Sequence, residues 1–162
     1  MRLQSKQLTD MAMMLALAMI MSYVEMLIPV VMPVYGMKLG IANVVIVITM
    51  YRISERAALL VNILRVIMVG FLFTNLYSVL FSIFGAVFSF TAMYAAKKSG
   101  KLSIYGVSIT GAVFHSIGQI IAAYFVLDTY GVIFYLPVMA AVSVLTGYVI
   151  GVISSIVKKH LQ

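Results

Sequence analysis

The chain has 162 residues, of which 64% are hydrophobic and 9% are charged, and its formal net charge at pH 7 is +7. Soluble domains carry about 25% charged residues, so this composition excludes a soluble globular fold. There is no cysteine, which excludes a disulfide framework, a thiol nucleophile and a cysteine-based metal site. The basic residues lie in short gaps between apolar runs, a pattern that orients helices in a bilayer rather than one that binds nucleic acid. We expect an all-α integral membrane protein with no metal centre and no cofactor.

Six apolar segments are expected to cross the membrane as one domain that covers residues 1–162. A crossing helix needs about 20 mostly apolar residues. The first segment is longer than the apolar core of a signal peptide, which is about 7–15 residues, so we expect it to be retained. The second segment is short and must be tilted, partly re-entrant or extended by its neighbours, and the third and fourth form a tight hairpin. The predicted spans are 11–32, 39–51, 57–74, 76–96, 104–127 and 132–157.

The distribution of basic residues predicts the orientation of this six-helix bundle. A cytoplasmic N-terminus leaves only Lys38 on the outer side, while Arg65 lies within the third span. This bias follows the positive-inside rule and requires an even number of crossings, which four or six spans satisfy. We expect six crossings with both termini cytoplasmic. The basic residues on the inner side are then Arg2, Lys6, Arg52, Arg56, Lys97, Lys98, Lys101, Lys158 and Lys159.

The first span carries a pair of small residues toward its inner end and an acid toward its outer end. Ala12 and Ala16 lie four residues apart, and small residues at this spacing let another helix approach closely. Alanine pairs are common in membrane helices, so the pair alone is weak evidence for an interface. Glu25 is expensive to bury in lipid and is expected to face protein or a water-filled cavity.

The connection PVVMPVYGMKLGIANVV (29–45) contains the one outer cation and the first polar residue of the second span. Pro29 and Pro33 end or kink the first helix, and the glycines allow a compact loop. Lys38 and the backbone donors of this loop, followed by Asn43 at the helix start, would suit a lid over an anionic or polar ligand. The alternative is an ordinary connector with a lysine anchored at the interface.

Two further spans place polar side chains at depth. Arg65 lies inside the third span, while His115 and Gln119 lie four residues apart in the fifth span and share one helical face. At a rise of about 1.5 Å per residue, these three groups, Glu25 and Asn43 all fall between the midplane and the outer side. Glu25 and Arg65 differ in height by about 10 Å, so a direct ion pair would require the arginine to reach up.

These residues have two interpretations. Histidine and glutamine form hydrogen bonds between membrane helices, and a Glu25–Arg65 pair would be structural, so bundle cohesion is one explanation. The other is a pocket open to the outside, lined by the fifth-span stripe that begins at Ser108 and Gly111. We favour the pocket, because an acid, a base, an imidazole and two amides exceed what cohesion needs.

Four segments of the sequence resemble a small membrane family known as the Gx transporters, which is also labelled heptaprenyl diphosphate synthase component I. The patterns K-L-G-x-x-N, from Lys38 to Asn43, and H-x-x-x-Q, from His115 to Gln119, are its most specific features here. Ser116 departs from the family pattern, which has asparagine, and this puts one polar contact in question. The segments are YGMKLGIANVV (35–45), VNILRVIMVG (61–70), LYSVLFSIFGAVFSFTAM (76–93) and GVSITGAVFHSIGQ (106–119).

That family is similar in turn to the substrate-binding S components of energy-coupling-factor (ECF) transporters. The resemblance implies a multi-pass protein of a prokaryotic plasma membrane, with six helices and an external ligand pocket partly covered by the first loop. It implies ligand contacts from Glu25 and from the residues of the matched segments, Lys38, Asn43, Arg65, His115 and Gln119. It also implies that Ala12 and Ala16 dock a transmembrane coupling subunit, which works with two cytoplasmic ATPases.

Three functions fit these features. The first is an S component that captures a small vitamin- or quinone-precursor-like molecule and takes its energy from partners, because the chain has no G-x-x-x-x-G-K-[ST] loop. The second is a part in polyprenyl diphosphate synthesis. Prenyl elongation needs clustered aspartates to hold Mg²⁺, and the only aspartates are Asp10 and Asp128, so we expect a non-catalytic role and no enzyme activity. The third, a proton-coupled carrier using Glu25 and His115, is disfavoured by the small size and the lack of a visible inverted repeat.

Overall fold

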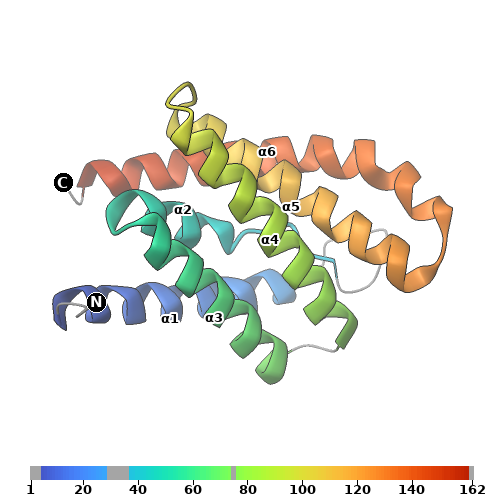
Figure 1. Ribbon diagram of the computed structural model, residues 1–162, viewed down its shortest axis with the longest axis horizontal. Helices are drawn as coiled ribbons and strands as arrows, with labels where there is room; N and C mark the ends of the chain where they lie inside the picture. Colours follow the sequence, from blue (N-terminus) through green and yellow to red (C-terminus); the bar gives the residue numbers. More distant parts are fainter. Residues whose placement is uncertain (1–4, 29–36, 74–75, 161–162) are drawn as a thin grey trace.

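The computed structural model describes residues 5–28, 37–73 and 76–160, and the regular elements in these ranges are all helical (Figure 1). Five of the helices are long and apolar enough to cross a membrane, so the chain is a multi-pass membrane protein. The elements are α1 (Ser5–Leu27), α2 (Asn43–Arg52), α3 (Glu55–Phe73), α4 (Leu76–Lys98), α5 (Ile104–Leu127), the 3₁₀ helix η1 (Tyr130–Tyr135) and α6 (Leu136–His160).

The predicted spans agree with these helices except at the first, second and sixth. Helix α1 begins at Ser5 and ends at Leu27, whereas the prediction was 11–32. The helix ends early because proline disfavours the helical conformation in the residue before it, and Pro29 follows closely; residues 29–32 lie outside the described residues. The sixth span begins as the 3₁₀ helix η1 and continues as α6 to His160.

The second span differs most from the prediction. Helix α2 begins at Asn43 rather than at residue 39, and residues 37–42 are not helical. Gly40 has a backbone φ of +83°, a conformation that suits glycine because it has no Cβ. With ten residues, α2 is about 15 Å long, roughly half of the hydrocarbon thickness of about 30 Å. Helix α2 alone is therefore too short to cross the membrane.

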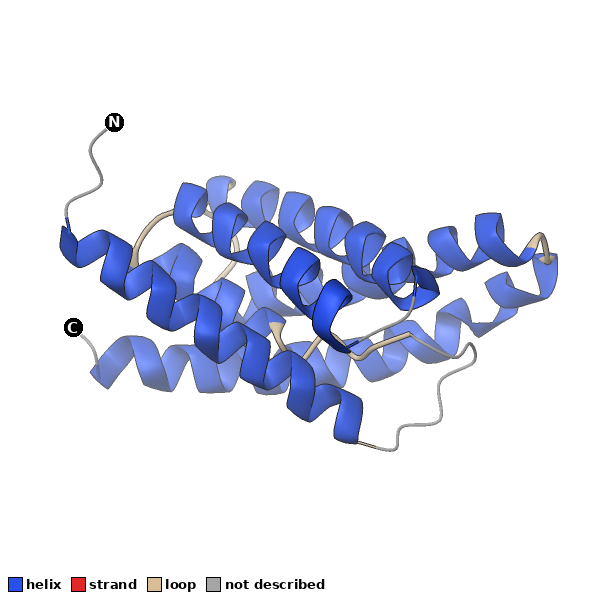
Figure 2. Ribbon diagram, turned by 90° about the horizontal axis from the view of Figure 1, so that it is seen from below, coloured by secondary structure: helices blue, strands red, loops and turns tan. Residues whose placement is uncertain are grey.

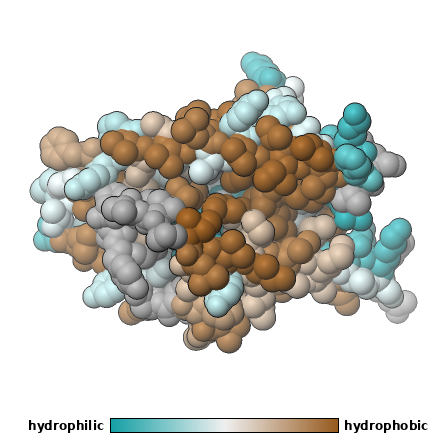
Figure 3. All heavy atoms as spheres, turned by 180° about the vertical axis from the view of Figure 1, so that it is seen from behind, coloured by the Kyte–Doolittle hydropathy of each residue, from teal (hydrophilic) through white to brown (hydrophobic). Residues whose placement is uncertain are grey.

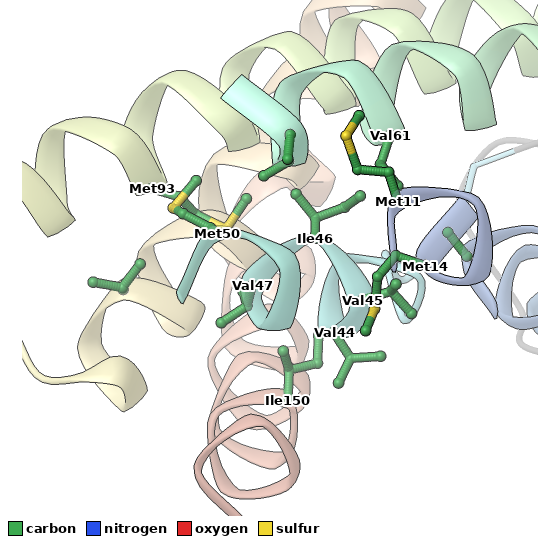
Figure 4. Close-up of a cluster of buried hydrophobic side chains, with 14 of the residues drawn as sticks. Met11, Met14, Val44, Val45, Ile46, Val47, Met50, Val61, Met93 and Ile150 are labelled. Carbon is green, nitrogen blue, oxygen red and sulfur yellow. The ribbon is translucent and has the colours of Figure 1, made fainter. Parts of the chain in front are cut away.

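Helix α2 lies in the middle of the molecule, where it packs against α1, α3, α5 and α6. Apolar residues surround the helix on all sides, which is typical of a helix buried in a core. Figure 4 shows this core from close by: Met14 of α1 lies beside Val45 of α2, and Met93 of α4 lies beside Met50 of α2. Its labelled residues are Met11, Met14, Val44, Val45, Ile46, Val47, Met50, Val61, Met93 and Ile150.

Glycines bring α4, α5 and α6 into backbone contact. A Cβ added at Gly118 of α5 would lie 2.5 Å from the backbone oxygen of Phe84, and one at Gly147 of α6 would lie 2.6 Å from Cα of Ile109. Such close approach through small residues is how membrane helices gain packing energy. It holds α5 rigidly between α4 and α6 and so fixes the polar face of α5.

The C-terminal turns of α2, α4 and α6 meet at one end of the molecule. Lys97 Nζ of α4 lies 2.7 Å from the Met50 carbonyl oxygen and 2.5 Å from Glu55 Oε1. The ring of Tyr51 lies between two cations, with its centroid 4.9 Å from Lys97 Nζ and 5.2 Å from Lys158 Nζ. Cations near the C-terminal ends of helices are stabilised by the negative ends of the helix dipoles.

The charged end of the molecule is also the end where α1 begins and α6 stops. Figures 1 and 2 both show these two helix ends on the same side. Figure 3, which views the molecule from behind, shows hydrophilic residues gathered at that end and a mostly hydrophobic surface elsewhere. This arrangement agrees with an even number of crossings, while the cytoplasmic assignment of this end remains a prediction.

Candidate functional site

His115 and Gln119 lie on the buried face of α5 and hold the connection before α2. Gln119 Oε1 accepts a hydrogen bond from the backbone N–H of Lys38, and Gln119 Nε2 donates to the carbonyl oxygen of the same residue, both at 3.0 Å. Gln119 Nε2 also lies 2.6 Å from His115 Nε2. The two side chains therefore bind each other, and Gln119 binds the backbone of the connection.

Glu25, near the C-terminal end of α1, binds the same connection. Its Oε1 accepts hydrogen bonds from the backbone N–H groups of Gly40 and Ile41, the second at 3.2 Å. Glu25 is buried, with 7% of its surface exposed. Residues 37–42 are thus held between α1 and α5 by two polar side chains.

Lys38 lies in this connection and is partly buried. Burial lowers the pKa of its ammonium group below the usual value, and the negative charge of Glu25 opposes that effect. A desolvated lysine of this kind gains more from an anionic partner than an exposed lysine does.

Arg65 of α3 is buried, with 5% of its surface exposed, and it does not pair directly with Glu25. Its Nη2 donates to Oδ1 of Asn62, one turn earlier on α3, at 2.8 Å, and its Nη1 lies 3.4 Å from Ser22 Oγ. Ser22 lies one turn before Glu25 on α1. The guanidinium group therefore contacts α1 one turn before Glu25, and both of its hydrogen-bond partners are neutral.

Helix α4 packs against the site through small residues, among them Gly85 and Ser89. A Cβ added at Gly85 would lie 2.7 Å from Cε1 of His115, so only glycine leaves room for the imidazole. Asn43 Nδ2 donates to Ser89 Oγ at 3.3 Å, one turn further along α4. Asn62 Nδ2 donates to the carbonyl oxygen of Ala86 at 3.4 Å. Helix α4 thus contacts side chains from α2, α3 and α5.

Most of the residues that the sequence singled out as ligand contacts lie around residues 37–42. Glu25 and Gln119 bind the backbone of this connection, and a Cβ at Gly40 would lie 3.0 Å from Asn43 Nδ2 and 3.1 Å from His115 Cδ2. Lys38 contributes its backbone groups, whereas Arg65 contacts Ser22 and Asn62. The role of these six residues as ligand contacts stays a prediction.

The remaining predicted positions fall on two different surfaces. Ser108 and Gly111 are buried on α5, as their spacing with His115 predicted. Ser116 faces α6 instead, where its Oγ lies 2.6 Å from Ser143 Oγ, so the residue that departs from the family pattern makes an interhelical bond away from the site.

Ala12 and Ala16 of α1 are exposed, while Met11, Met14 and Ala18 of the same helix are buried. The small-residue pair is therefore uncovered by the described part of the chain, on the side of α1 away from the core. A surface of this kind is open to lipid or to another helix.

Sequence reasoning missed four members of the site: Ser22, Asn62, Gly85 and Ser89. Asn62 could have been predicted, because residues three apart lie on the same side of a helix and asparagine can form a hydrogen bond with an arginine there. Ser22 and Ser89 could not, since serines in membrane helices commonly form hydrogen bonds with their own backbone. Gly85 could be recognised only once His115 was placed opposite it.

The family comparison agrees with the elements that build this site. The family model for heptaprenyl diphosphate synthase component I matches residues 14–157, a range that includes all six predicted ligand contacts. The chain belongs to the heptaprenyl diphosphate synthase component I family. No curated protein and no solved structure shows a significant match to it.

Proposed function

We propose that this member of the heptaprenyl diphosphate synthase component I family is the substrate-binding membrane component of an ECF-type uptake transporter. In this role it captures a small vitamin- or quinone-precursor-like molecule from outside the plasma membrane. A transmembrane coupling subunit and two cytoplasmic ATPases would then supply the energy for release inside.

The observation that carries the proposal is the polar cluster beneath residues 37–42. Buried polar groups in a membrane protein are expensive and usually mark a substrate pathway. Here Glu25, Asn43, Arg65, His115 and Gln119 have exposed fractions between 0% and 7% and come from four helices. A bundle held by glycine packing, as α4, α5 and α6 are, does not need this many polar groups for cohesion.

The surface of α1 supports the partner part of the proposal. Ala12 and Ala16 are exposed side by side on one helix face, and small residues allow a partner helix to pack closely.

A second candidate function rests on the family description. The protein would be a non-catalytic membrane component of polyprenyl diphosphate or quinone synthesis, as the words "heptaprenyl diphosphate synthase component I" suggest. Asp10 and Asp128, the only aspartates, lie near the start of α1 and after the end of α5. They cannot share one Mg²⁺, so catalysis would belong to a partner.

Affinity purification from the native membrane in mild detergent separates the two functions. Co-purification of ATP-binding subunits, with uptake lost when their nucleotide sites are mutated, is the result expected for the transporter. A soluble prenyl synthase in their place would overturn the transporter proposal and support the second function. Mass spectrometry of small molecules retained by the purified protein identifies the ligand class in the same preparation.

A further inference from the structure

Arg65 is a buried cation whose hydrogen-bond partners in the described part of the chain carry no negative charge. A buried guanidinium group without an acidic partner in contact is destabilising in a low-dielectric interior. Within the described residues, the hydrogen bonds of Arg65 go to Asn62 and Ser22, both neutral. Its Nε has no hydrogen-bond partner there and is fully buried.

The nearest acid is already engaged elsewhere. Glu25 interacts with Arg65 only through longer-range electrostatics, because its Oε1 accepts the N–H groups of Gly40 and Ile41. Asn43 Oδ1 is a second buried atom without a partner in the described part of the chain. The site thus contains an unpaired donor, Arg65 Nε, and an unpaired acceptor, Asn43 Oδ1.

We infer that Arg65, positioned by Asn62 and Ser22, binds the single negative charge of the substrate, most simply a carboxylate. The inference rests on the transporter function proposed above and specifies the chemical class of its ligand. With Arg65 and Lys38 protonated, Glu25 ionised and the imidazole neutral, the cluster carries a net charge of +1. One negative charge on the ligand neutralises it, whereas a phosphate dianion or a diphosphate would leave excess negative charge in a desolvated site.

The surroundings also define the rest of the ligand. Beside Lys38, Met37 packs with Phe81 and Ile120 in an apolar cluster, so a ligand that contacts residues 37–42 meets apolar side chains as well as charge. An organic monocarboxylate with an apolar body could contact both the charged groups and these apolar side chains. An inorganic ion could contact only the charged groups.

The test measures thermal unfolding of the full-length purified protein in detergent with four matched probes at millimolar concentration. The probes are benzoate, benzamide, benzylamine and phenyl phosphate as its dianion, which share one ring and differ in charge. We expect benzoate to raise the unfolding midpoint by a few degrees, as a ligand at about ten times its Kd does. The other three probes should raise it by less than one third of that shift. Equal shifts with benzamide or benzylamine would overturn the inference.

Variants test which residues supply the charge. Arg65→Gln should abolish the benzoate shift, while Lys101→Gln, an exposed cation in the α4–α5 connection, should retain it. A benzoate shift that survives in Arg65→Gln would overturn the assignment. Glu25→Gln keeps an acceptor for Gly40 and Ile41 but raises the net charge, so it should move the preference from benzoate toward phenyl phosphate. This comparison remains decisive if Arg65→Gln does not fold.

These outcomes are independent of the transporter test. If ATP-binding subunits co-purify and benzoate has no selective effect, the transporter function stands and the monoanion class fails. If benzoate binds selectively through Arg65 and no ATP-binding subunit co-purifies, the transporter function fails and the anion site stands.

Discussion

The side chain of Gln119 pairs with the backbone of Lys38 through two hydrogen bonds of 3.0 Å, across 81 positions of the sequence. This pairing satisfies both the N–H and the C=O of one residue, much as a neighbouring strand would. It fixes residues 37–42 on α5 without any regular secondary structure.

Replacing Gln119 with leucine should release residues 37–42. Both backbone groups of Lys38 lose their partner, so we expect the free energy of unfolding to fall by about 2 kcal/mol or more. Hydrogen exchange at Lys38, Gly40 and Ile41 should accelerate. Phe125→Leu, an exposed change on the same helix, serves as the control. Unchanged exchange in Gln119→Leu would show that the connection is held by other contacts.

Gly85→Ala should displace the imidazole of His115, because the added Cβ would lie 2.7 Å from Cε1. Overpacking of this kind costs about 1–3 kcal/mol, which a thermal unfolding experiment detects, and ligand binding should weaken at the same time. In Gly131→Ala the nearest atom to the Cβ is Thr129 Cγ2 at 3.6 Å, so this variant should match the wild type. Equal stability of the two variants would contradict the packing described for α4 and α5.

Leucine at Ala12 or Ala16 should leave the isolated protein intact and block coupling to its partner. Both positions are exposed, and surface substitutions change stability by less than about 0.5 kcal/mol. Uptake should nevertheless fall, because the larger side chain keeps a partner helix away. Met13→Leu, on the same exposed surface, should keep uptake, whereas Ala18→Leu should unfold the protein, since Ala18 is fully buried. Normal uptake in both Ala12→Leu and Ala16→Leu would argue against docking at this surface.

Lys97 should matter more for stability than its neighbour Lys98. It bonds the last turn of α2 at Met50 and the start of α3 at Glu55, while Lys98 lies 5.9 Å from the ring of Tyr94 on its own helix. We expect Lys97→Ala to lower the free energy of unfolding by about 1–2 kcal/mol, because a hydrogen bond from a charged group is lost at a half-buried position. Lys98→Ala should change it by less than about 0.5 kcal/mol. A larger loss in Lys98→Ala would reverse this assignment.

The absence of cysteine from the sequence allows a direct test of orientation. Single cysteines at Lys101 and Thr129 lie in exposed connections at the two ends of α5. A membrane-impermeant maleimide added to whole cells should label the cysteine at position 129 and not the one at position 101, since basic residues favour the cytoplasmic side. The opposite labelling pattern would invert the proposed topology.

Much of the fold could be predicted because the bilayer imposes simple rules on length and charge. Apolar runs located α3, α4 and α5 within two residues at each end, and the spacing of His115 and Gln119 identified the buried face of α5. The form of residues 37–42 could not be predicted, because it depends on Glu25 and Gln119 binding backbone groups that any sequence possesses.

The partners of the buried charges were also beyond the sequence. Depth along each helix predicted a height difference of about 10 Å between Glu25 and Arg65, which a direct ion pair would have had to overcome. In the structure Arg65 contacts Ser22 and Asn62 instead. Depth could not show that Glu25 would accept hydrogen bonds from Gly40 and Ile41, or that Arg65 would bind Ser22 and Asn62. These partners depend on side-chain conformations between helices, which the periodicity of the sequence does not predict.

The burial of α2 has a consequence for how the protein is made. A helix of ten residues is too short to partition into lipid by itself as the ribosome delivers it. Its core neighbours include Ile150 of α6, which is synthesised about 100 residues later. We therefore expect α2 to settle last, after the longer helices have inserted. A nascent chain arrested before α6 should leave a cysteine at Val47 open to labelling, and the complete chain, in which Val47 is fully buried, should protect it.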